Sequence, residues 1–279
     1  MEWIQTLNKA IDYIEENLSE DIDCSKIAAH VCISSFHFQR TFNLLTDLTL
    51  GEYIRNRRLS LAGQELIKED VKIIDIALKY GYETPESFSK AFKRFHGITP
   101  NQAKRKGENL KSFNRLIIKI QLIGGSVMDY KIIKKDVFKL VIKSKTFNME
   151  SNLIDIPLFW DEYFKAGLGK VVCGEIGISI QENIGDKEFK YGIGEFYNES
   201  TLIPEGFEIL EVPSYDWAVF KCVGAMPNSI QDLWKRVYSE WLPQSSYELI
   251  PDFAIEYYTD GDIKSEDYIS EVWIPVKEK

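Results

Sequence analysis

The sequence predicts two domains, an all-α domain followed by an α+β domain. A length of 279 residues is enough for two separate cores. Apolar residues at helical spacing fill the first hundred positions, and strands alternate with helices from about residue 117 on. We expect a helical domain over 1–107, a linker or first strand over 108–127, and an α+β domain over 128–279.

Charge follows the same division. Residues 1–107 contain 15 basic and 15 acidic residues, so residues 108–279 hold 34 − 15 = 19 basic and 43 − 15 = 28 acidic ones. The second part therefore carries the whole net charge of −9. Within the first part, positions 87–106 contain six basic residues and no acidic one. Such sorting indicates that the two parts have different partners.

The composition is typical of a soluble cytoplasmic protein. Hydrophobic residues make up 44% and charged residues 28% of the chain. No apolar run approaches the ~18 residues of a membrane span, and the start MEWIQTLNKAIDY is too acidic for a signal peptide. We expect reduced thiols, no metal site and no cofactor, because the cysteines are widely spaced and form no C-x-x-C pair. They are Cys24, Cys32, Cys173 and Cys222.

Helix signals follow one another through residues 1–105. Asp23 is expected to cap a short helix, and Ser34 or Ser35 the next one. The remaining predicted helices cover about 50–68, 73–80, 85–96 and 100–105. The first helix is amphipathic, with apolar residues at helical spacing; these are Trp3, Leu7, Ala10, Ile11, Ile14 and Leu18.

This helical block repeats itself. IAAHVCISSFHFQRTFNLLTDLTLGEYI, from Ile27, matches IALKYGYETPESFSKAFKRFHGITPNQA, from Ile76, with one extra residue in the second turn. Each copy predicts a short helix, a tight turn and a second helix, which is the helix-turn-helix arrangement. Gly81 provides the turn residue of the second copy, and Cys32 stands there in the first, at a modest conformational cost.

Helical phasing gives the second helix of each copy an apolar side and a polar side. A polar side is commonly no more than a solvated surface, but two copies with the same turn and the same outer side favour DNA binding. Gln and Arg make bidentate contacts to base edges, and lysines suit phosphates. The outer residues, all DNA-binding candidates, are Phe36, Gln39, Arg40 and Asn43 in the first copy and Glu86, Ser87, Lys90, Lys93 and Arg94 in the second.

The pair of helix-turn-helices resembles the DNA-binding domain of AraC/XylS transcription regulators over about residues 5–107. FHFQRTF matches the first recognition helix of that family, and IALKYGYETPESFSKAFKRFHGITPNQAKR matches its second-half signature. The resemblance implies that two recognition helices enter successive major grooves about 34 Å apart. By position, it makes base readers of Phe36, Gln39 and Arg40 in the first helix and of Glu86, Ser87 and Lys90 in the second.

Glu86 is unusual among these readers because it is acidic. It either accepts a hydrogen bond from a cytosine amino group or weakens the second helix as a reader. We therefore expect the first helix to dominate sequence specificity. Since one chain carries both helices, a single polypeptide is expected to bind a DNA site of about 20 base pairs.

The second half predicts two β-α-β-β units that form one antiparallel sheet with two helices on one side. LIIKIQL, from residue 116, is a candidate first strand, and GGS at 124–126 a candidate flexible junction. The helices of the two units are SNLIDIPLFWDEYFKAG and SIQDLWKRVYSEWL. The last strand, YISEVWIPV, contains a single carboxylate, Glu271. On a period of two, Ile269, Glu271 and Trp273 share one face.

Glu271 has two interpretations. Its face of the strand is wet, or the carboxylate is buried to meet a positive group, because an ionised carboxylate that is dry and unpaired costs several kcal/mol. Aromatic rings nearby attract cations, and the second domain is both acidic and rich in tryptophan. Trp160, Tyr191 and Trp234 are further candidates for ligand contact, with packing in the core as the alternative for each.

This half resembles the gyrase-inhibitor-like small-molecule-binding domain over about residues 128–279. The resemblance rests on DWAVFKCVGAMPNSIQDLWKRVYSEWLPQSSYEL, DFAIEYYTDGD and SEVWIPV, and the whole chain has a Rob-like architecture. The resemblance implies a ligand site between the two β-α-β-β units, lined with aromatic residues and carrying a glutamate on the last strand. By position this glutamate is Glu271, and Trp273 lies beside it. A small-molecule effector, cationic or amphipathic, is the expected ligand.

The sequence favours a regulator over an enzyme. Its only histidines are His30, His37 and His96, all in the first domain, so the second has no imidazole base and no His metal ligand. We expect a transcription activator that binds double-stranded DNA and contacts RNA polymerase, under the control of its effector. The alternative is a second domain that sequesters toxic small molecules or hydrolyses them weakly with Glu271 or Glu195.

Overall fold

The computed structural model describes residues 2–68, 71–105, 108–118, 127–181, 188–198 and 203–279. The chain divides into two compact units, one formed mainly by residues before 122 and the other mainly by residues after it. Among the described helices, none has the length and apolar character needed to cross a membrane.

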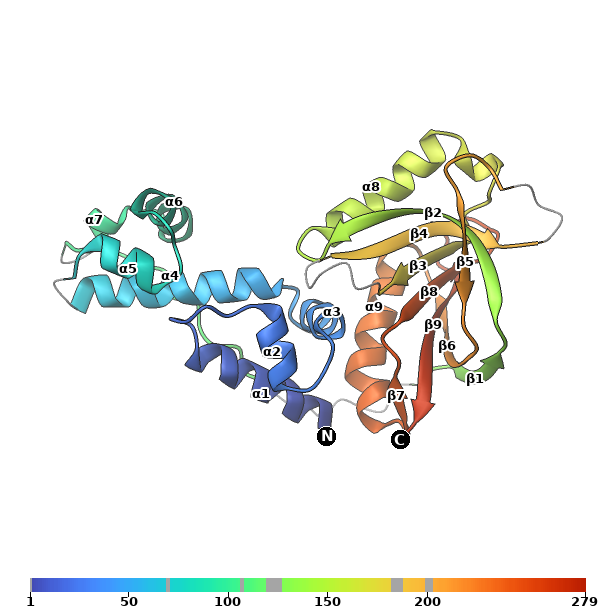
Figure 1. Ribbon diagram of the computed structural model, residues 1–279, viewed down its shortest axis with the longest axis horizontal. Coiled ribbons are helices and arrows are strands. Elements are labelled where there is room, and N and C mark those ends of the chain that lie inside the picture. The colour runs from blue at the N-terminus through green and yellow to red at the C-terminus, as the bar shows by residue number, and fades with distance from the viewer. Residues whose placement is uncertain (1, 69–70, 106–107, 119–126, 182–187, 199–202) are drawn as a thin grey trace. The chain divides into compact units, whose positions relative to one another are not determined.

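The first unit is helical, as predicted. Its longest helix, α4, has α1 and α2 near one end and α5, α6 and α7 near the other (Figure 1). Apolar side chains from α4, α5 and α6 form one core, in which Phe88 and Phe92 are fully buried. The helices are α1 (Glu2–Glu16), α2 (Cys24–His30), α3 (Ser35–Thr46), α4 (Leu50–Lys68), α5 (Ile73–Lys79), α6 (Pro85–His96) and α7 (Pro100–Ala103).

Local signals account for the two helix-turn-helices. Asp23 caps α2 by accepting a hydrogen bond from the Lys26 amide at 2.8 Å. Ser34 does the same for α3, since its hydroxyl accepts from the His37 amide at 3.2 Å. The turn residues of both copies have left-handed backbones, with φ +58° at Cys32 and +78° at Gly81. The predicted tight turn is thus present twice, and a cysteine adopts it once.

The second unit is an antiparallel sheet with two long helices, α8 (Asn152–Lys165) and α9 (Asn228–Arg236). Strand order is β1-β6-β9-β8-β3-β4-β2-β5, with β7 added beside β9. The order is symmetric about the β8–β3 pair, where the two predicted β-α-β-β repeats of this sheet join. The strands are β1 (Tyr130–Lys135), β2 (Phe138–Asn148), β3 (Ile176–Ile180), β4 (Glu188–Phe196), β5 (Glu208–Val212), β6 (Tyr215–Val223), β7 (Tyr247–Leu249), β8 (Phe253–Tyr258) and β9 (Ile269–Glu278).

Short helical turns follow both helices. A 3-10 turn, η1 (Leu168–Lys170), comes after α8, and α9 continues through a π-helical turn, η2 (Val237–Trp241), into a 3-10 turn, η3 (Leu242–Gln244). The predicted helix SIQDLWKRVYSEWL therefore has the right extent, but only its first part is α-helical.

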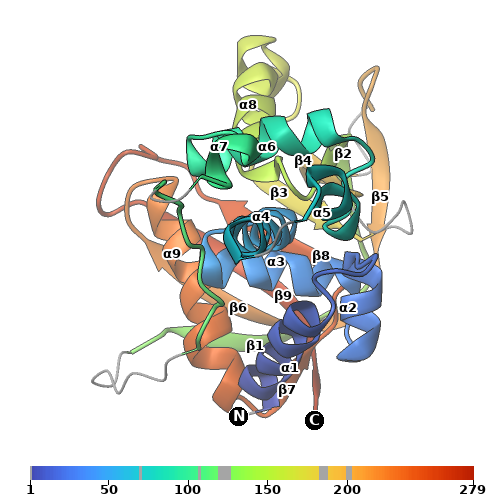
Figure 2. The same cartoon turned by 90° about the vertical axis from the view of Figure 1, so that its left-hand side faces the viewer.

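Both helices pack on one face of this sheet, as predicted. On this helix-covered face, Ala254 and Val272 belong to the core under α9, and Phe147 packs against Phe159 of α8 at 5.5 Å between ring centroids. The opposite face carries its own apolar cluster, which includes Ile178, Ile255 and Trp273. Figure 2 shows α8 and α9 beside the strands in a second view.

The predicted strand LIIKIQL can be followed only over its first three residues. Residues 116–118, the start of the predicted strand LIIKIQL, have no regular secondary structure. The rest of that segment and the predicted junction GGS lie outside the described residues. The Leu116 amide donates to the Tyr53 hydroxyl of α4 at 3.2 Å, so this backbone group is satisfied by the helical unit rather than by a neighbouring strand.

Candidate DNA-binding surface and effector site

The outer side of α6 is exposed along its whole length, while Phe88 and Phe92 on its inner side are fully buried. Thr84 caps the helix, accepting from the Ser87 amide at 3.1 Å, and the Ser87 hydroxyl donates to the Thr84 carbonyl at 2.8 Å. The Ser87 hydroxyl therefore uses its proton within the first turn of the helix. The exposed residues include all five sequence candidates of this helix, Glu86, Ser87, Lys90, Lys93 and Arg94.

The candidates of the first copy lie on α3. Phe38 and Phe42 are fully buried, and by helical phase the side opposite to them carries Phe36, Gln39, Arg40 and Asn43. In this copy, however, Gln39 is buried and Phe36, Arg40 and Asn43 are half-buried, so only the candidates on α6 are exposed.

In the second unit, a carboxylate that the sequence reasoning missed is the centre of a hydrogen-bond network. Glu256 of β8 accepts from the Trp234 indole nitrogen at 2.8 Å through one oxygen. Its other oxygen accepts from the hydroxyls of Tyr258 at 2.9 Å and Tyr191 at 3.3 Å. All three donors are neutral. Among the described residues, no lysine or arginine forms an ion pair with this carboxylate.

Trp160 of α8 extends this network. Its indole nitrogen donates to the Tyr191 hydroxyl at 3.1 Å, and its ring meets the Tyr258 ring edge-on at 5.3 Å. Burial raises the pKa of both tyrosines well above 10.0, and the neighbouring Glu256 charge raises it further. The two hydroxyls therefore stay protonated and act as donors at neutral pH.

Gly177 makes room for this arrangement. It lies opposite Glu256 on the paired strand β3, and a Cβ atom there would stand 2.1 Å from the Tyr191 hydroxyl and 3.1 Å from the Trp160 ring. A side chain at residue 177 would therefore displace the tyrosine that links Trp160 to Glu256.

The structure does not bring all five predicted effector residues together. Trp160, Tyr191 and Trp234 meet around Glu256 on the helix-covered face, whereas Glu271 and Trp273 lie on the opposite face, because Glu271 pairs with Tyr257 in register. A glutamate between apolar residues is a signal that FAIEYY shares with YISEVWIPV, so the sequence could have indicated Glu256 as well.

Glu271 meets a positive group, as one of its two interpretations supposed. Its oxygens accept from the Trp273 indole nitrogen at 2.7 Å and from the Lys131 ammonium at 3.4 Å. The side chain is 21% exposed, so the carboxylate is neither dry nor fully solvated. This face already provides a partial counter-charge for its own carboxylate.

The opposite face also holds a cation among aromatic rings. The Lys135 ammonium lies 4.3 Å from the ring centroid of Phe196, 4.8 Å from that of Phe138 and 4.9 Å from that of Trp273. Burial lowers the pKa of Lys135 from its usual value. The aromatic groups of this face thus surround a cation from the chain itself.

Glu195, named with Glu271 for the hydrolase alternative, accepts a hydrogen bond from the Cys173 amide at 2.6 Å. Burial, with the bond to Glu195, raises the pKa of the Cys173 thiol to about 12. This thiol stays protonated at neutral pH and is therefore a poor nucleophile.

Comparison with known proteins assigns both units. A helix-turn-helix domain family matches residues 27–106, and the family of integron-associated effector binding proteins matches residues 131–276, more than half of the chain. The activator AarP of Providencia stuartii is 39% identical over 95 residues, which are 34% of this chain and 70% of AarP. The chain belongs to the AraC family of transcription regulators.

Other AraC-family relatives match the same third of the chain. The regulatory protein SoxS of Salmonella typhimurium is 40% identical over 98 residues, 35% of this chain and 89% of SoxS. The multiple antibiotic resistance protein MarA of Escherichia coli is 30% identical over 97 residues, 35% of this chain and 76% of MarA. This AraC-family member is thus a DNA-binding regulator with a gyrase-inhibitor-like effector-binding domain.

Solved structures resemble the second unit. One is the structure of SAV2435 bound to tetraphenylphosphonium. The matched region is 54% of this chain and 94% of the SAV2435 chain, with 25% identity and a TM-score of 0.49. Another is the integron cassette protein VCH_CASS2 of Vibrio cholerae. The matched region is 53% of this chain and 95% of the VCH_CASS2 chain, with 16% identity and a TM-score of 0.42.

Proposed function

We propose that this AraC-family regulator is an activator whose effector is a cationic or amphipathic aromatic molecule bound at Glu256. The observation that carries the proposal is the Glu256 carboxylate, which accepts from three neutral hydrogen-bond donors and forms no ion pair with the described residues. A cation placed beside this carboxylate gains a direct charge–charge attraction to it.

The surrounding side chains fit the apolar part of such a ligand. Trp160 and Trp234 come from the two helices, and Tyr191 and Tyr258 from the strands beneath them. Aromatic faces attract a cation by about 0.5–2 kcal/mol each, depending on how dry the site is. A carboxylate among aromatic rings therefore selects for positive charge and for aromatic bulk together.

The experiment is a calorimetric titration of the full chain with two probes of similar bulk. Tetraphenylphosphonium is the cationic probe and triphenylphosphine oxide the neutral one. Glu256→Gln removes the charge and keeps the side-chain size. Because unit charges about 6 Å apart attract each other by roughly 3 kcal/mol at an effective dielectric constant near 20, the Kd for the cation should rise roughly 100-fold. Binding of the neutral probe should change little.

Glu271→Gln is the matched control, since it removes a carboxylate that also accepts from a tryptophan indole but lies on the opposite face. It should leave both titrations unchanged. If Glu271→Gln weakens cation binding and Glu256→Gln does not, the effector site belongs to the opposite face and the proposal is wrong.

For the DNA-binding unit, we propose that α3 and α6 read bases with the outer residues given above. Changing Arg40 to Ala should cost about 1–3 kcal/mol at one base pair of the site. Changing Lys93 to Ala should instead weaken binding to all sequences and reduce the salt dependence, as expected of a phosphate contact. An Arg40→Ala chain with an unchanged sequence preference would remove the direct-readout role.

The similarity to AarP, which is named as a transcriptional activator, supports activation rather than repression and a contact with RNA polymerase. Transcription in vitro with purified polymerase tests this point. We expect transcript from a bound promoter to increase with the chain present, and to depend on tetraphenylphosphonium in the wild type but not in Glu256→Gln. A decrease in transcript would identify a repressor.

A further inference from the structure

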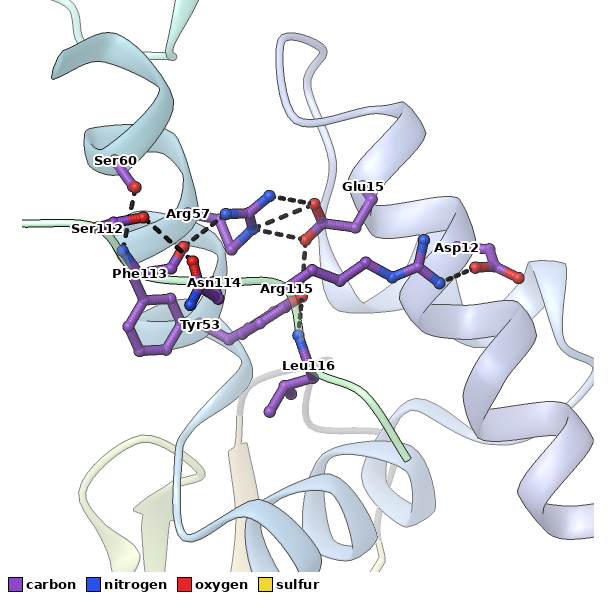
Figure 3. A network of polar contacts seen from close by, with 10 residues as sticks. All are labelled: Asp12, Glu15, Tyr53, Arg57, Ser60, Ser112, Phe113, Asn114, Arg115 and Leu116. Atoms are coloured by element: carbon purple, nitrogen blue, oxygen red, sulfur yellow. Dashed lines mark hydrogen bonds and ion pairs between the residues drawn. The ribbon is translucent and has the colours of Figure 1, made fainter. Parts of the chain in front are cut away.

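A segment without regular secondary structure runs along the helical unit after the second helix-turn-helix. We call residues 110–116 the strap. Leu110, Phe113 and Leu116 are half-buried, while the residues between them are exposed. Figure 3 shows how polar groups of the helices bind its backbone.

Three successive turns of α4 hold the strap. The Ser60 hydroxyl accepts from the Phe113 amide at 3.0 Å, and the Arg57 guanidinium donates to the Phe113 carbonyl at 2.5 Å. The Tyr53 hydroxyl accepts from the Leu116 amide at 3.2 Å. The strap therefore runs antiparallel to α4 and is bound through its main chain.

The ends of the strap reach the two halves of the DNA-binding unit. The Lys111 amide donates to Nδ1 of His96, the last residue of α6, at 3.2 Å. His96 Nε2 in turn lies 2.9 Å from the Leu59 carbonyl of α4. Arg115 forms an ion pair with Asp12 of α1. One segment thus connects the second helix-turn-helix, α4 and α1.

The residues beneath the strap form a tight network of their own. Glu15 of α1 accepts from Arg57 at 2.6 Å and from Tyr53 at 2.6 Å. Arg57 and Glu15 are only 12% and 13% exposed. Burial alone would raise the pKa of Glu15, but the hydrogen bonds from Arg57 and Tyr53 outweigh it and lower the pKa. The strap therefore rests on a rigid, charged support.

We propose that the strap is a positioning element that fixes the two helix-turn-helices at the separation needed to read one DNA site. The inference rests on the proposal that both α3 and α6 contact bases. α4 alone, with 19 residues, is a helix about 28 Å long, and the helix-turn-helices lie at its two ends (Figure 1). The strap adds a second connection between these ends.

The physical reason is the entropy of bivalent binding. When one recognition helix is bound, the second binds at an effective concentration set by how narrowly its position is restricted. A strap that is bound at both ends restricts α1 and α6 relative to α4. Releasing it lowers the affinity for a two-groove site without changing the affinity of either half.

The test uses the full chain and a duplex that the wild type selects from a random library. Derivatives of this duplex carry one scrambled half or one extra base pair between the halves. The variant Ser60→Ala/Arg115→Ala removes two attachments of the strap and leaves the Glu15–Arg57–Tyr53 network in place. We expect it to bind the selected duplex roughly tenfold more weakly, to bind half-scrambled duplexes like the wild type, and to tolerate the inserted base pair better.

Ser112→Ala is the matched control, because among the described residues that hydroxyl hydrogen-bonds only to Asn114 of the strap itself; it should behave as the wild type. Leu116→Pro, which removes the amide that binds Tyr53, provides a second release variant. Equal losses on full and half-scrambled duplexes, or no loss on the full duplex, overturn the proposal. If scrambling one half leaves the wild type unaffected, only one helix reads DNA and the underlying function proposal fails instead.

Discussion

On each face of the sheet a tryptophan indole donates to a glutamate, Trp234 to Glu256 on the helix-covered face and Trp273 to Glu271 on the other. The surroundings of the two pairs differ. Glu271 has Lys131 within 3.4 Å, and the aromatic rings next to it surround Lys135. Glu256 has only indole and phenol donors. Glu256 therefore offers a foreign cation an ion pair, whereas Glu271 already forms one with Lys131.

The largest expected effect comes from filling the space beneath the Glu256 network. Gly177→Ala should displace Tyr191, lower the free energy of unfolding by about 1–3 kcal/mol and abolish tetraphenylphosphonium binding. Gly192→Ala is the matched change on the opposite face, where a Cβ would meet the flexible end of Ile142 at 2.7 Å. Urea unfolding and calorimetry measure both variants. Loss of cation binding in Gly192→Ala alone would reverse the roles of the two faces.

Removing the cation of the opposite face should have a smaller effect. Lys135→Gln loses the interactions with three rings and should lower the free energy of unfolding by about 0.5–2 kcal/mol, with no loss of cation binding at Glu256. Lys134→Gln, an exposed neighbour on the same strand, serves as its control. Equal stability of the two variants in urea unfolding would show that the ring contacts of Lys135 contribute nothing.

The smallest effect is a pH dependence of stability. Burial, then the Glu256 charge, raises the pKa of Tyr191 well above 10.0 in the folded chain. Above pH 10 the unfolded chain loses this proton and the folded chain keeps it, so stability falls as pH rises, by about 1.4 kcal/mol per pH unit. Below pH 10 the hydroxyl contributes its full stabilisation. Urea unfolding between pH 9 and 11 should therefore show a shallower decline for Tyr191→Phe than for the wild type; parallel curves contradict this.

The helical unit could be predicted from the sequence in detail because its determinants are local. Asp23, Ser34 and Thr84 cap helices within three residues of themselves, and the apolar spacing of each helix shows its buried side. The repeat then fixes the helix-turn-helix interpretation. Even the turn at Cys32 was predictable, since its position matches Gly81 in the second copy.

The candidate effector site could be predicted only in part because its determinants are distant in sequence. The donors to Glu256 come from α9, β4 and β8, and no pattern in FAIEYY shows that these elements converge. The same holds for Glu271, whose partner Lys131 is 140 residues away. The strap escaped prediction for the same reason, because its partners Ser60, Arg57 and Tyr53 are 53 to 63 residues away in the sequence.

The most direct test of the account follows the indole N–H signals of the tryptophans by NMR while the full chain is titrated with tetraphenylphosphonium. Trp160→Phe, Trp234→Phe and Trp273→Phe assign the three signals of interest. We expect the signals of Trp160 and Trp234 to shift with a common Kd and the signal of Trp273 to stay in place. A shift of the Trp273 signal, with those of Trp160 and Trp234 unchanged, would contradict this expectation.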